Sequence, residues 1–345
     1  MNGWKSLLKA DPVPWLLEED NPSVRYFTLV DIVGLSPRDR RVAAARRAIM
    51  EKGIVPKILA LQKESGYWES PEDFYIRTKY KGTVWQLIIL AELGAGGSDP
   101  RIRKACEFVL EYSQDRTSGG FAYRGSRGGG GQHSAVIPCL TGNMVWSLIR
   151  LGRLRDARVR RGLDWITTYA RFDDGESRAP KAWPYDKREP CWGKHTCHSA
   201  AAKFLKALAE IPEGERSADI RRTIDEATEY FLKHHIYKRS HNLNKAVKPK
   251  WEKFGFPTVW DGDALEVFEI LARLGCRDSR MQDAADLIIS KQDEQGRWLL
   301  ENTYNGKFRA NIERKDRPSK WVTLLALRAL RHWPPHIHDK ISIEG

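Results

Sequence analysis

Five stretches of the chain carry apolar side chains on nearly every side, as in the run Trp85-Gln86-Leu87-Ile88-Ile89-Leu90-Ala91. A helix that is apolar all round is buried, so this pattern predicts buried helices. The stretches cover residues 83–94, 142–152, 198–210, 262–275 and 319–330. Their spacing of about 55–65 residues is longer than the period of the common two-helix solenoid repeats.

A more charged segment with apolar residues on one face precedes each buried stretch. These segments, residues 47–62, 101–113, 158–170, 221–234 and 279–292, predict amphipathic outer helices. Cap-and-proline pairs such as Ser36-Pro37 and Asp99-Pro100 mark helix starts. Asn21-Pro22 opens one more helix, within residues 15–35. Alternating β-branched runs are few, so strand signals are poor.

Repeated pairs of outer and inner helices can be arranged in two main folds. One is an open solenoid, and the other is a closed barrel of inner helices inside a ring of outer helices. The loops that join outer to inner helices are about 20–30 residues long, and loops of that length are usually functional. All of them emerge beside the N-terminal ends of the buried helices, so we expect the functional site at that end.

Two of these loops begin with the same string, Gln-x-x-x-Gly-x-Trp. It runs from Gln62 to Trp68 and from Gln292 to Trp298, and a looser copy runs from Gln114 to Gly119-Gly120-Phe121. The strings resemble the QW repeats of squalene–hopene and oxidosqualene cyclases, and the Gly-Gly-Phe form resembles the β-subunit repeat of protein prenyltransferases. The resemblance covers most of the chain, although the third and fourth repeats are degenerate.

This resemblance implies an all-α fold, an α/α toroid around a central cavity. We expect a barrel of inner helices within a ring of outer helices, built from about five or six helical hairpins. A single domain would span residues 1–345, with the N-terminal helix at residues 15–35 completing the ring. At this length the chain offers one toroid, whereas squalene cyclases resemble two fused helical domains.

Composition excludes several classes of protein. The 345 residues are 41% hydrophobic and 30% charged, which describes a folded protein rather than a disordered one. No run of about 18 apolar residues exists, so no helix is expected to span a membrane. Residues 1–20 lack an apolar signal core, and five cysteines are an odd count that favours reduced thiols or metal ligands. We therefore expect a cytoplasmic protein.

The formal net charge is +13, from 58 Lys and Arg against 45 Asp and Glu. Basic residues gather at 38–47, 153–161 and 237–253, and the first two clusters have the helical spacing of a solvated helix face. No zinc-finger spacing, RNA-recognition signature or helix-turn-helix is present, which argues against nucleic acid as a partner. The remaining basicity fits an anionic, phosphate-bearing small molecule or peripheral contact with lipid headgroups.

Three of the five cysteines lie at two neighbouring helix starts, where they suggest a metal site. Cys139 at one start and the adjacent pair Cys197-His198 at the next resemble the zinc ligand set of lanthionine cyclases, another α/α toroid. If Cys191 is a fourth ligand, the site is closed and structural; if not, an open position can hold water, thiolate or substrate. The alternative is a set of reduced core thiols with a hydrogen-bonded histidine.

The segment Val259-Trp260-Asp261-Gly262-Asp263-Ala264 resembles the Asp-x-Asp-Asp acid motif of class II terpene cyclases. By that match Asp263 would be the protonating acid and Asp261 its companion, although Ala264 replaces the last aspartate. An acid strong enough to protonate an alkene must be kept protonated by its surroundings. The alternative is that both aspartates are ordinary helix caps.

Three further polar residues lie at the predicted helix starts and are candidates for substrate binding: Asn143, His195 and Lys320. Lys320 could bind an anionic group such as diphosphate, or it could serve solubility alone. Together these features favour a zinc-containing enzyme of cyclase or transferase type, acting in the central cavity on an apolar, isoprenoid-like or thiol-bearing substrate. The alternative is a non-catalytic toroid with a structural zinc that binds a ligand or a protein.

Overall fold

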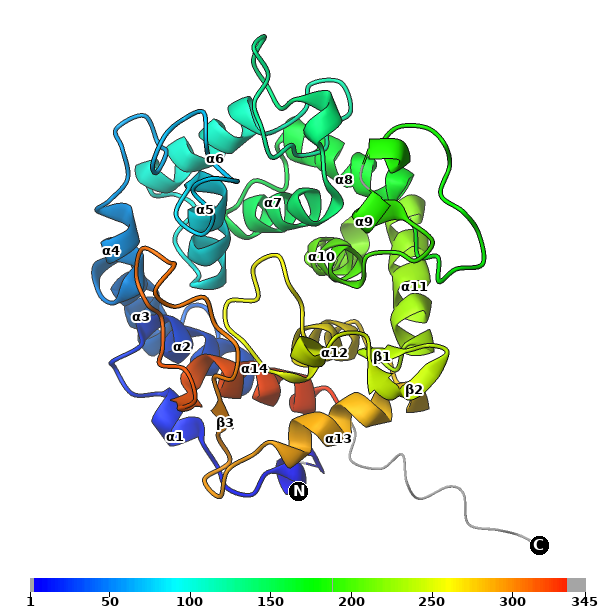
Figure 1. The fold of residues 1–345 in the computed structure, drawn as a ribbon. Coiled ribbons are helices and arrows are strands. Elements are labelled where there is room, and N and C mark those ends of the chain that lie inside the picture. Colours follow the sequence, from blue (N-terminus) through cyan, green and yellow to red (C-terminus); the bar gives the residue numbers. More distant parts are fainter. Residues whose placement is uncertain (1–2, 188, 334–345) are drawn as a thin grey trace, which may run out of the picture.

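The computed structural model describes residues 3–187 and 189–333, which form a closed ring of helices in two layers (Figure 1). The last inner helix contacts the first, and the helices follow one another around a complete circle, so the ring is closed and not an open solenoid. The inner layer consists of α2 (Pro22–Phe27) with its π-helical continuation η2 (Thr28–Ile32), α5 (Thr83–Glu92), α7 (Pro138–Arg150), α10 (His198–Ala209), α12 (Ala264–Arg273) and α14 (Lys320–Arg331). The prediction of an all-α toroid is confirmed.

The outer layer alternates with the inner layer along the chain. It consists of α1 (Val13–Leu16), α3 (Arg40–Glu51), α4 (Ile54–Leu59), α6 (Pro100–Tyr112), α8 (Ala157–Tyr169), α11 (Ala218–Lys233) and α13 (Gln282–Ser290). The long loops carry α9 (Glu189–Trp192) and two short antiparallel pairs, β1 (Lys238–Arg239) with β2 (Asn242–Ala246) and β3 (Trp298–Leu299) with β4 (Pro318–Ser319). Single 3₁₀ turns are η1 (Gly3–Leu7), η3 (His133–Ala135), η4 (Tyr185–Lys187), η5 (Glu213–Glu215), η6 (Pro249–Glu252) and η7 (Ser279–Met281).

Two predicted helices have other bounds in the structure. The helix expected within residues 15–35 begins at Pro22, where Asn21 caps it as predicted by accepting a hydrogen bond from the Val24 N–H at 3.2 Å, and the residues before Pro22 form the separate helix α1. The helix expected at residues 47–62 is α3 and α4, separated at Gly53, whose φ of +78° a helix does not tolerate. Residues 1–2, 188 and 334–345 of the expected domain lie outside the described part.

The Gln-x-x-x-Gly-x-Trp strings each form hydrogen bonds that join neighbouring helices. In the first string, the Trp68 indole donates to the carbonyl of Ile58 at 2.9 Å, and the Trp68 backbone N–H donates to the Thr83 hydroxyl at 3.1 Å. Ile58 belongs to an outer helix and Thr83 starts the next inner helix. The Gln62 amide reaches across to the carbonyl of Arg101 at 2.9 Å, in the following outer helix. One string therefore joins three helices.

The other strings repeat these bonds. The Trp298 indole donates to the Ile288 carbonyl at 2.7 Å, and its backbone N–H donates to the Thr323 hydroxyl at 3.0 Å. In the looser copy, Phe121 N–H donates to the Thr141 hydroxyl at 2.9 Å. A threonine in the first turns of the inner helix is thus the partner each time.

Outer helices share a second repeat that the sequence analysis did not identify. An Asp-x-Arg sequence starts four of them, and in each the Asp caps the helix by accepting the Arg backbone N–H while the guanidinium binds the same carboxylate. The four pairs are Asp39 with Arg41, Asp99 with Arg101, Asp156 with Arg158, and Asp278 with Arg280. No described helix has both the length and the apolar character needed to cross a membrane.

We expect Trp298→Phe to lower the free energy of unfolding by about 1–3 kcal/mol, because the Ile288 carbonyl loses the shorter of its two hydrogen bonds and keeps only the one from the Lys291 N–H. Urea denaturation followed by fluorescence or circular dichroism measures this change. Trp4→Phe is the control, because the Trp4 indole is partly exposed and donates no hydrogen bond to the described residues. Equal effects of the two substitutions would contradict the role assigned to the indole N–H.

Candidate functional site

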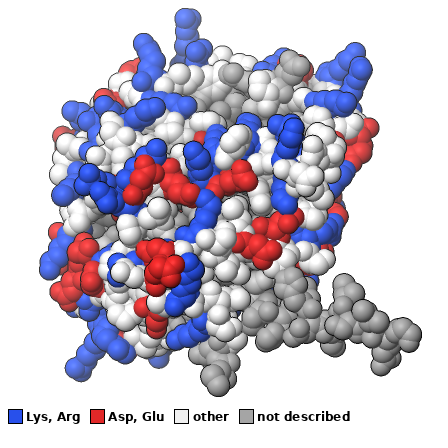
Figure 2. Space-filling view, turned by 60° about the horizontal axis from the view of Figure 1, so that its bottom comes forward, with Lys and Arg blue, Asp and Glu red and all other residues white. Residues whose placement is uncertain are grey.

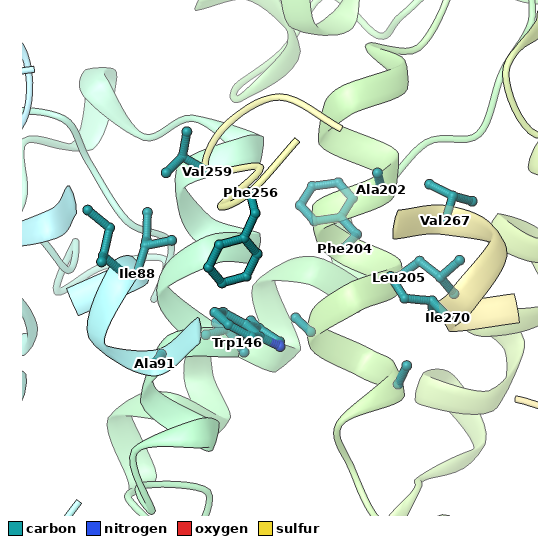
Figure 3. Packing of buried hydrophobic residues seen from close by; sticks show 14 of the residues in the cluster. Ile88, Ala91, Trp146, Ala202, Phe204, Leu205, Phe256, Val259, Val267 and Ile270 are labelled. Atoms are coloured by element: carbon teal, nitrogen blue, oxygen red, sulfur yellow. The ribbon is translucent and has the colours of Figure 1, made fainter. Parts of the chain in front are cut away.

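The N-terminal end of the inner ring, where we expected the site, is filled by the chain itself. Residues 247–263, here called the plug segment, enter the ring along its axis, as the yellow loop in Figure 1 shows. Phe256 stacks on Trp321 of α14 with ring centroids 4.1 Å apart, and Figure 3 shows Phe256 beside Trp146 of α7. A substrate that entered at this end would have to displace the plug segment.

Asp261 anchors the plug segment. Its carboxylate binds the Lys250 ammonium and accepts a hydrogen bond from the Tyr304 hydroxyl. The Asp261 residue is 3% exposed and does not line the central cavity described below. In this arrangement Asp261 joins the start of the plug segment to the loop that precedes β4.

Asp263 is the cap of α12. One carboxylate oxygen accepts the Glu266 backbone N–H at 2.8 Å, and the other accepts the Gly255 backbone N–H at 2.9 Å. Burial, with a smaller contribution from the Glu266 carboxylate, raises the pKa of Asp263 to about 7. The raised pKa is what an acid catalyst needs, but both oxygens are occupied and neither faces the central cavity. The hydrogen bonds of Asp263 are those of a helix cap, which was the alternative interpretation of this residue in the sequence analysis.

The residues proposed as zinc ligands are only partly brought together. Cys191 and Cys197 lie close enough to Cys139 that, after burial itself, they raise the pKa of the Cys139 thiol. His198 turns away from them: its Nε2 donates to the Ile236 carbonyl at 2.8 Å, so its Nδ1 accepts from the Tyr230 hydroxyl at 3.0 Å.

Burial also lowers the pKa of His198 to about 3, so the ring is neutral and both of its nitrogens are occupied. Across residues 3–187 and 189–333, no group of three or more His, Cys, Asp or Glu side chains is placed to hold a metal ion. These residues do not fit a zinc ion as arranged, and we derive no step through a metal.

The three candidates for substrate binding have structural partners elsewhere. The Asn143 amide donates to the carbonyl of Val259 at 3.0 Å and so holds the plug segment. His195 lies on the periphery, 3.4 Å from Asp174. The Lys320 ammonium binds Glu18 at 2.8 Å and also Asp20, which fastens the N-terminal segment to α14. None of the three lines the central cavity.

The central cavity has a volume of about 430 Å³ and opens at the opposite end, beside the C-terminal ends of the inner helices. Its rim residues are the last residues of four inner helices, namely Glu92, Arg150, Arg273 and Arg331. Three aromatic rings, those of Trp146, Phe256 and Trp321, form part of its wall. The plug segment supplies Phe256 and Thr258, so it closes the cavity toward the other end.

A buried ionic network forms the inner part of the cavity. Glu266 of α12 accepts hydrogen bonds from the Lys203 ammonium at 2.7 and 2.8 Å, from Lys206 at 2.9 Å and from the Thr258 hydroxyl at 2.6 Å. Burial alone would raise the pKa of Glu266, but the two ammonium groups outweigh it and hold the pKa at about 2. Lys206 also binds Glu92 of α5, so the network ties three inner helices and the plug segment together.

The rim carries as many carboxylates as guanidinium groups. Its four arginines are Arg150, Arg273, Arg328 and Arg331, and its four acids are Asp31, Glu92, Glu210 and Glu269. Arg150 and Arg273 share Glu210 at 3.5 and 3.4 Å, which are long contacts. Arg328 binds Asp31 closely and also lies over the Phe27 ring, 4.7 Å from its centroid. The rim is therefore balanced in formal charge, but Arg331 donates only to the backbone carbonyls of Asp31 and Ile32 and has no carboxylate partner among the described residues.

Two indole N–H groups at the cavity lack acceptors. Trp146 and Trp321 are 3% and 1% exposed, and their Nε1 atoms have no hydrogen-bond partner among the described residues. A buried donor without an acceptor costs about 1–3 kcal/mol. Both nitrogen atoms are themselves buried, so a ligand with an oxygen acceptor reaches them only where the indole rings turn toward the cavity.

The sequence did contain a signal for this site. Lys203 and Lys206 interrupt an otherwise apolar buried helix, and Glu266 does the same in α12. Charged residues are almost never fully buried unless they are paired. Their positions could have indicated an ionic site inside the ring.

Neither a family model nor a curated protein matches the chain. Among solved structures, the apo type II terpene cyclase MstE from Scytonema is 14% identical over 84% of this chain and 96% of that chain, with a TM-score of 0.31. A family 76 glycoside hydrolase from a bovine Bacteroides thetaiotaomicron strain is 14% identical over 72% of this chain and 55% of that chain, with a TM-score of 0.40. A protein from Actinoplanes is 14% identical over 84% of this chain and 98% of that chain, with a TM-score of 0.32. At such identities and scores we infer no function from these likenesses.

We expect Glu266→Gln to destabilise the protein by about 3–5 kcal/mol at neutral pH, because Lys203 is left buried without its counter-charge. The folded-state pKa of Glu266 is about 2, below its ordinary value of 4.5. The stability it contributes is therefore complete above pH 4.5 and lost as the pH falls toward 2. Urea unfolding at several pH values should show the difference from wild type shrinking only below pH 4.5.

The control for this experiment is Glu294→Gln. Glu294 pairs with Lys9, but its side chain is 91% exposed, and exposed pairs contribute little. A difference between wild type and Glu266→Gln that stays constant down to pH 2 would show that the carboxylate charge is not what stabilises the ring.

Proposed function

We propose that this toroid binds a small molecule in its central cavity, with an apolar, isoprenoid-like part against the aromatic wall and an anionic group at the arginine rim. The observation that supports this proposal most directly is the aromatic wall that includes Trp146, Phe256 and Trp321, beside a rim on which Arg331 has no carboxylate partner among the described residues. A volume of about 430 Å³ is in the range of small-molecule sites.

The aromatic wall also suits a cationic intermediate, which supports a reaction of cyclase or transferase type. The Lys206 ammonium occupies one face of the Trp146 ring, 4.1 Å from its centroid, so the rings of Phe256 and Trp321 are the part of the wall that would stabilise such a cation. His332 at the rim would accept a proton released in such a reaction. Burial lowers the pKa of His332, so the imidazole is neutral at pH 7.

One observation favours non-catalytic binding as the second candidate. Every carboxylate that lines the cavity in the described structure is already ion-paired, in the pairs Asp31–Arg328, Glu92–Lys206, Glu210–Arg150, Glu266–Lys203 and Glu269–Arg273. An ion-paired carboxylate is a poor general acid, because the positive partner keeps it deprotonated. Under this candidate the cavity holds its ligand without converting it.

The test is binding and turnover of an isoprenoid diphosphate, compared with the isoprenoid alcohol of the same chain length. We expect the diphosphate to bind more tightly, because only it has an anionic group for the rim. Trp146→Phe should weaken binding about fivefold by reducing the aromatic wall against which the ligand packs. Because the substitution also removes buried ring volume, we expect it to lower the free energy of unfolding by about 0.5–3 kcal/mol.

Trp165→Phe is the matched control, because its buried indole N–H is also unpartnered but lies outside the cavity. We expect it to lower the free energy of unfolding by a similar amount and to leave binding unchanged. Binding of the diphosphate without any product would favour the non-catalytic candidate. Absence of binding to both isoprenoids would reject the apolar part of the proposed ligand.

A further inference from the structure

A second pocket, of about 670 Å³, lies next to the central cavity and has a strongly positive lining. It is bounded by α3, by the turn between α5 and α6, and by the turn between α7 and α8. Five arginines line this pocket, here called the arginine pocket, against a single acid, Glu51: Arg46, Arg47, Arg103, Arg150 and Arg153. On the face of the molecule in Figure 2, by contrast, basic and acidic residues are interspersed.

Several of these guanidinium groups are available to a ligand. Arg47 and Arg103 are exposed and form no hydrogen bond or ion pair with any described residue. The Arg153 guanidinium interacts with the Cys106 thiol and the Asp156 carboxylate, although its buried Nε has no hydrogen-bond partner in the same part of the chain. Arg150 makes a long contact of 3.5 Å with Glu210 and lies over the Phe27 ring, and Arg46 donates to a neutral acceptor, the carbonyl of Gly94.

Backbone donors lie beside the guanidinium groups. The turn Gly96-Gly97-Ser98 lines the arginine pocket, and the N–H groups of Gly97 and Ser98 find no acceptor in the described structure. The Gly96 N–H donates only to the sulfur of Met50, at 3.1 Å, and a thioether is a weak acceptor. A Cβ on Gly97 would lie 2.2 Å from the Leu151 carbonyl oxygen, so glycine lets this turn pack directly on the α7–α8 turn.

We propose that the arginine pocket binds a phosphate or oligophosphate group. Guanidinium forms bidentate, charge-assisted hydrogen bonds with phosphate oxygens, and unpaired backbone N–H groups add further donors. Concentrated positive charge around a concave surface destabilises the free protein by self-repulsion, and a multivalent anion relieves that cost. The site does not depend on the central cavity, because Arg47 and Arg103 line the arginine pocket and not the cavity.

Titration calorimetry with tripolyphosphate at low ionic strength tests the proposal. We expect binding to the wild type and a loss of at least about tenfold in affinity for the double variant Arg47→Gln/Arg103→Gln. Because neither side chain has a partner, this variant should fold with an unchanged melting temperature. Arg47→Lys/Arg103→Lys should retain part of the affinity, since it keeps the charge but not the bidentate geometry.

The matched control is Arg127→Gln/Arg314→Gln, which removes the same charge from two exposed arginines outside the arginine pocket. If this control loses as much affinity as the pocket variant, binding is diffuse electrostatics and the proposal is wrong. Absence of tripolyphosphate binding to the wild type, together with absence of binding to phosphatidic acid vesicles, would also overturn it.

The same variants separate two sources of phosphate. Cosedimentation with phosphatidylcholine vesicles, with and without phosphatidic acid, reports a lipid headgroup, whereas calorimetry with tripolyphosphate reports a soluble ligand. Loss of either signal in Arg47→Gln/Arg103→Gln supports the pocket and names the source. Trp146→Phe should leave both signals unchanged, so failure of the central-cavity proposal and failure of this one are distinguishable.

Discussion

The hydrogen bonds between each repeat tryptophan and its two flanking helices are the contacts on which the ring depends. Trp68 joins the end of an outer helix, through Ile58, to the start of the next inner helix, through Thr83. These donors and acceptors are buried, and a buried polar group left unpaired costs more than the bond itself contributes. Each loop is therefore held in the one position that lets successive helix pairs close into a ring, and only a closed ring encloses a cavity.

Closing the ring leaves a hole along its axis, and the plug segment determines which end of that hole is usable. Phe256 fills the axis by stacking on Trp321, and Thr258 carries a hydroxyl to the buried Glu266. The plug segment is itself fixed by Asn143 and Asp261, two residues that the sequence had suggested for ligand binding and catalysis. Because one end is closed in this way, the polar residues in the second halves of the inner helices form the accessible site.

The sequence was sufficient for the fold but not for the site, and the reasons lie in particular residues. Apolar periodicity and the Gln-x-x-x-Gly-x-Trp strings are local, so they identified the helix pairs. An aspartate at the start of a helix can serve as a cap or as an acid catalyst, and the sequence alone does not distinguish the two roles. The hydrogen bonds from the Gly255 and Glu266 N–H groups show that Asp263 caps its helix. Likewise Cys197 and His198 are adjacent in sequence but face different neighbours, which spacing cannot reveal.

The central cavity and the arginine pocket differ in how their positive charges are balanced, and this difference indicates where the net charge of the chain resides. Inside the ring, Lys203 and Lys206 are matched by Glu266 and Glu92, because an unpaired charge in the interior would cost several kcal/mol. Burial therefore enforces balance at the centre and cannot account for an excess of +13. The excess must lie where solvent tolerates unpaired charge, and the arginine pocket is one such place. There five guanidinium groups converge on a concave surface instead of spreading apart, an arrangement that repulsion opposes and that a bound anion would stabilise.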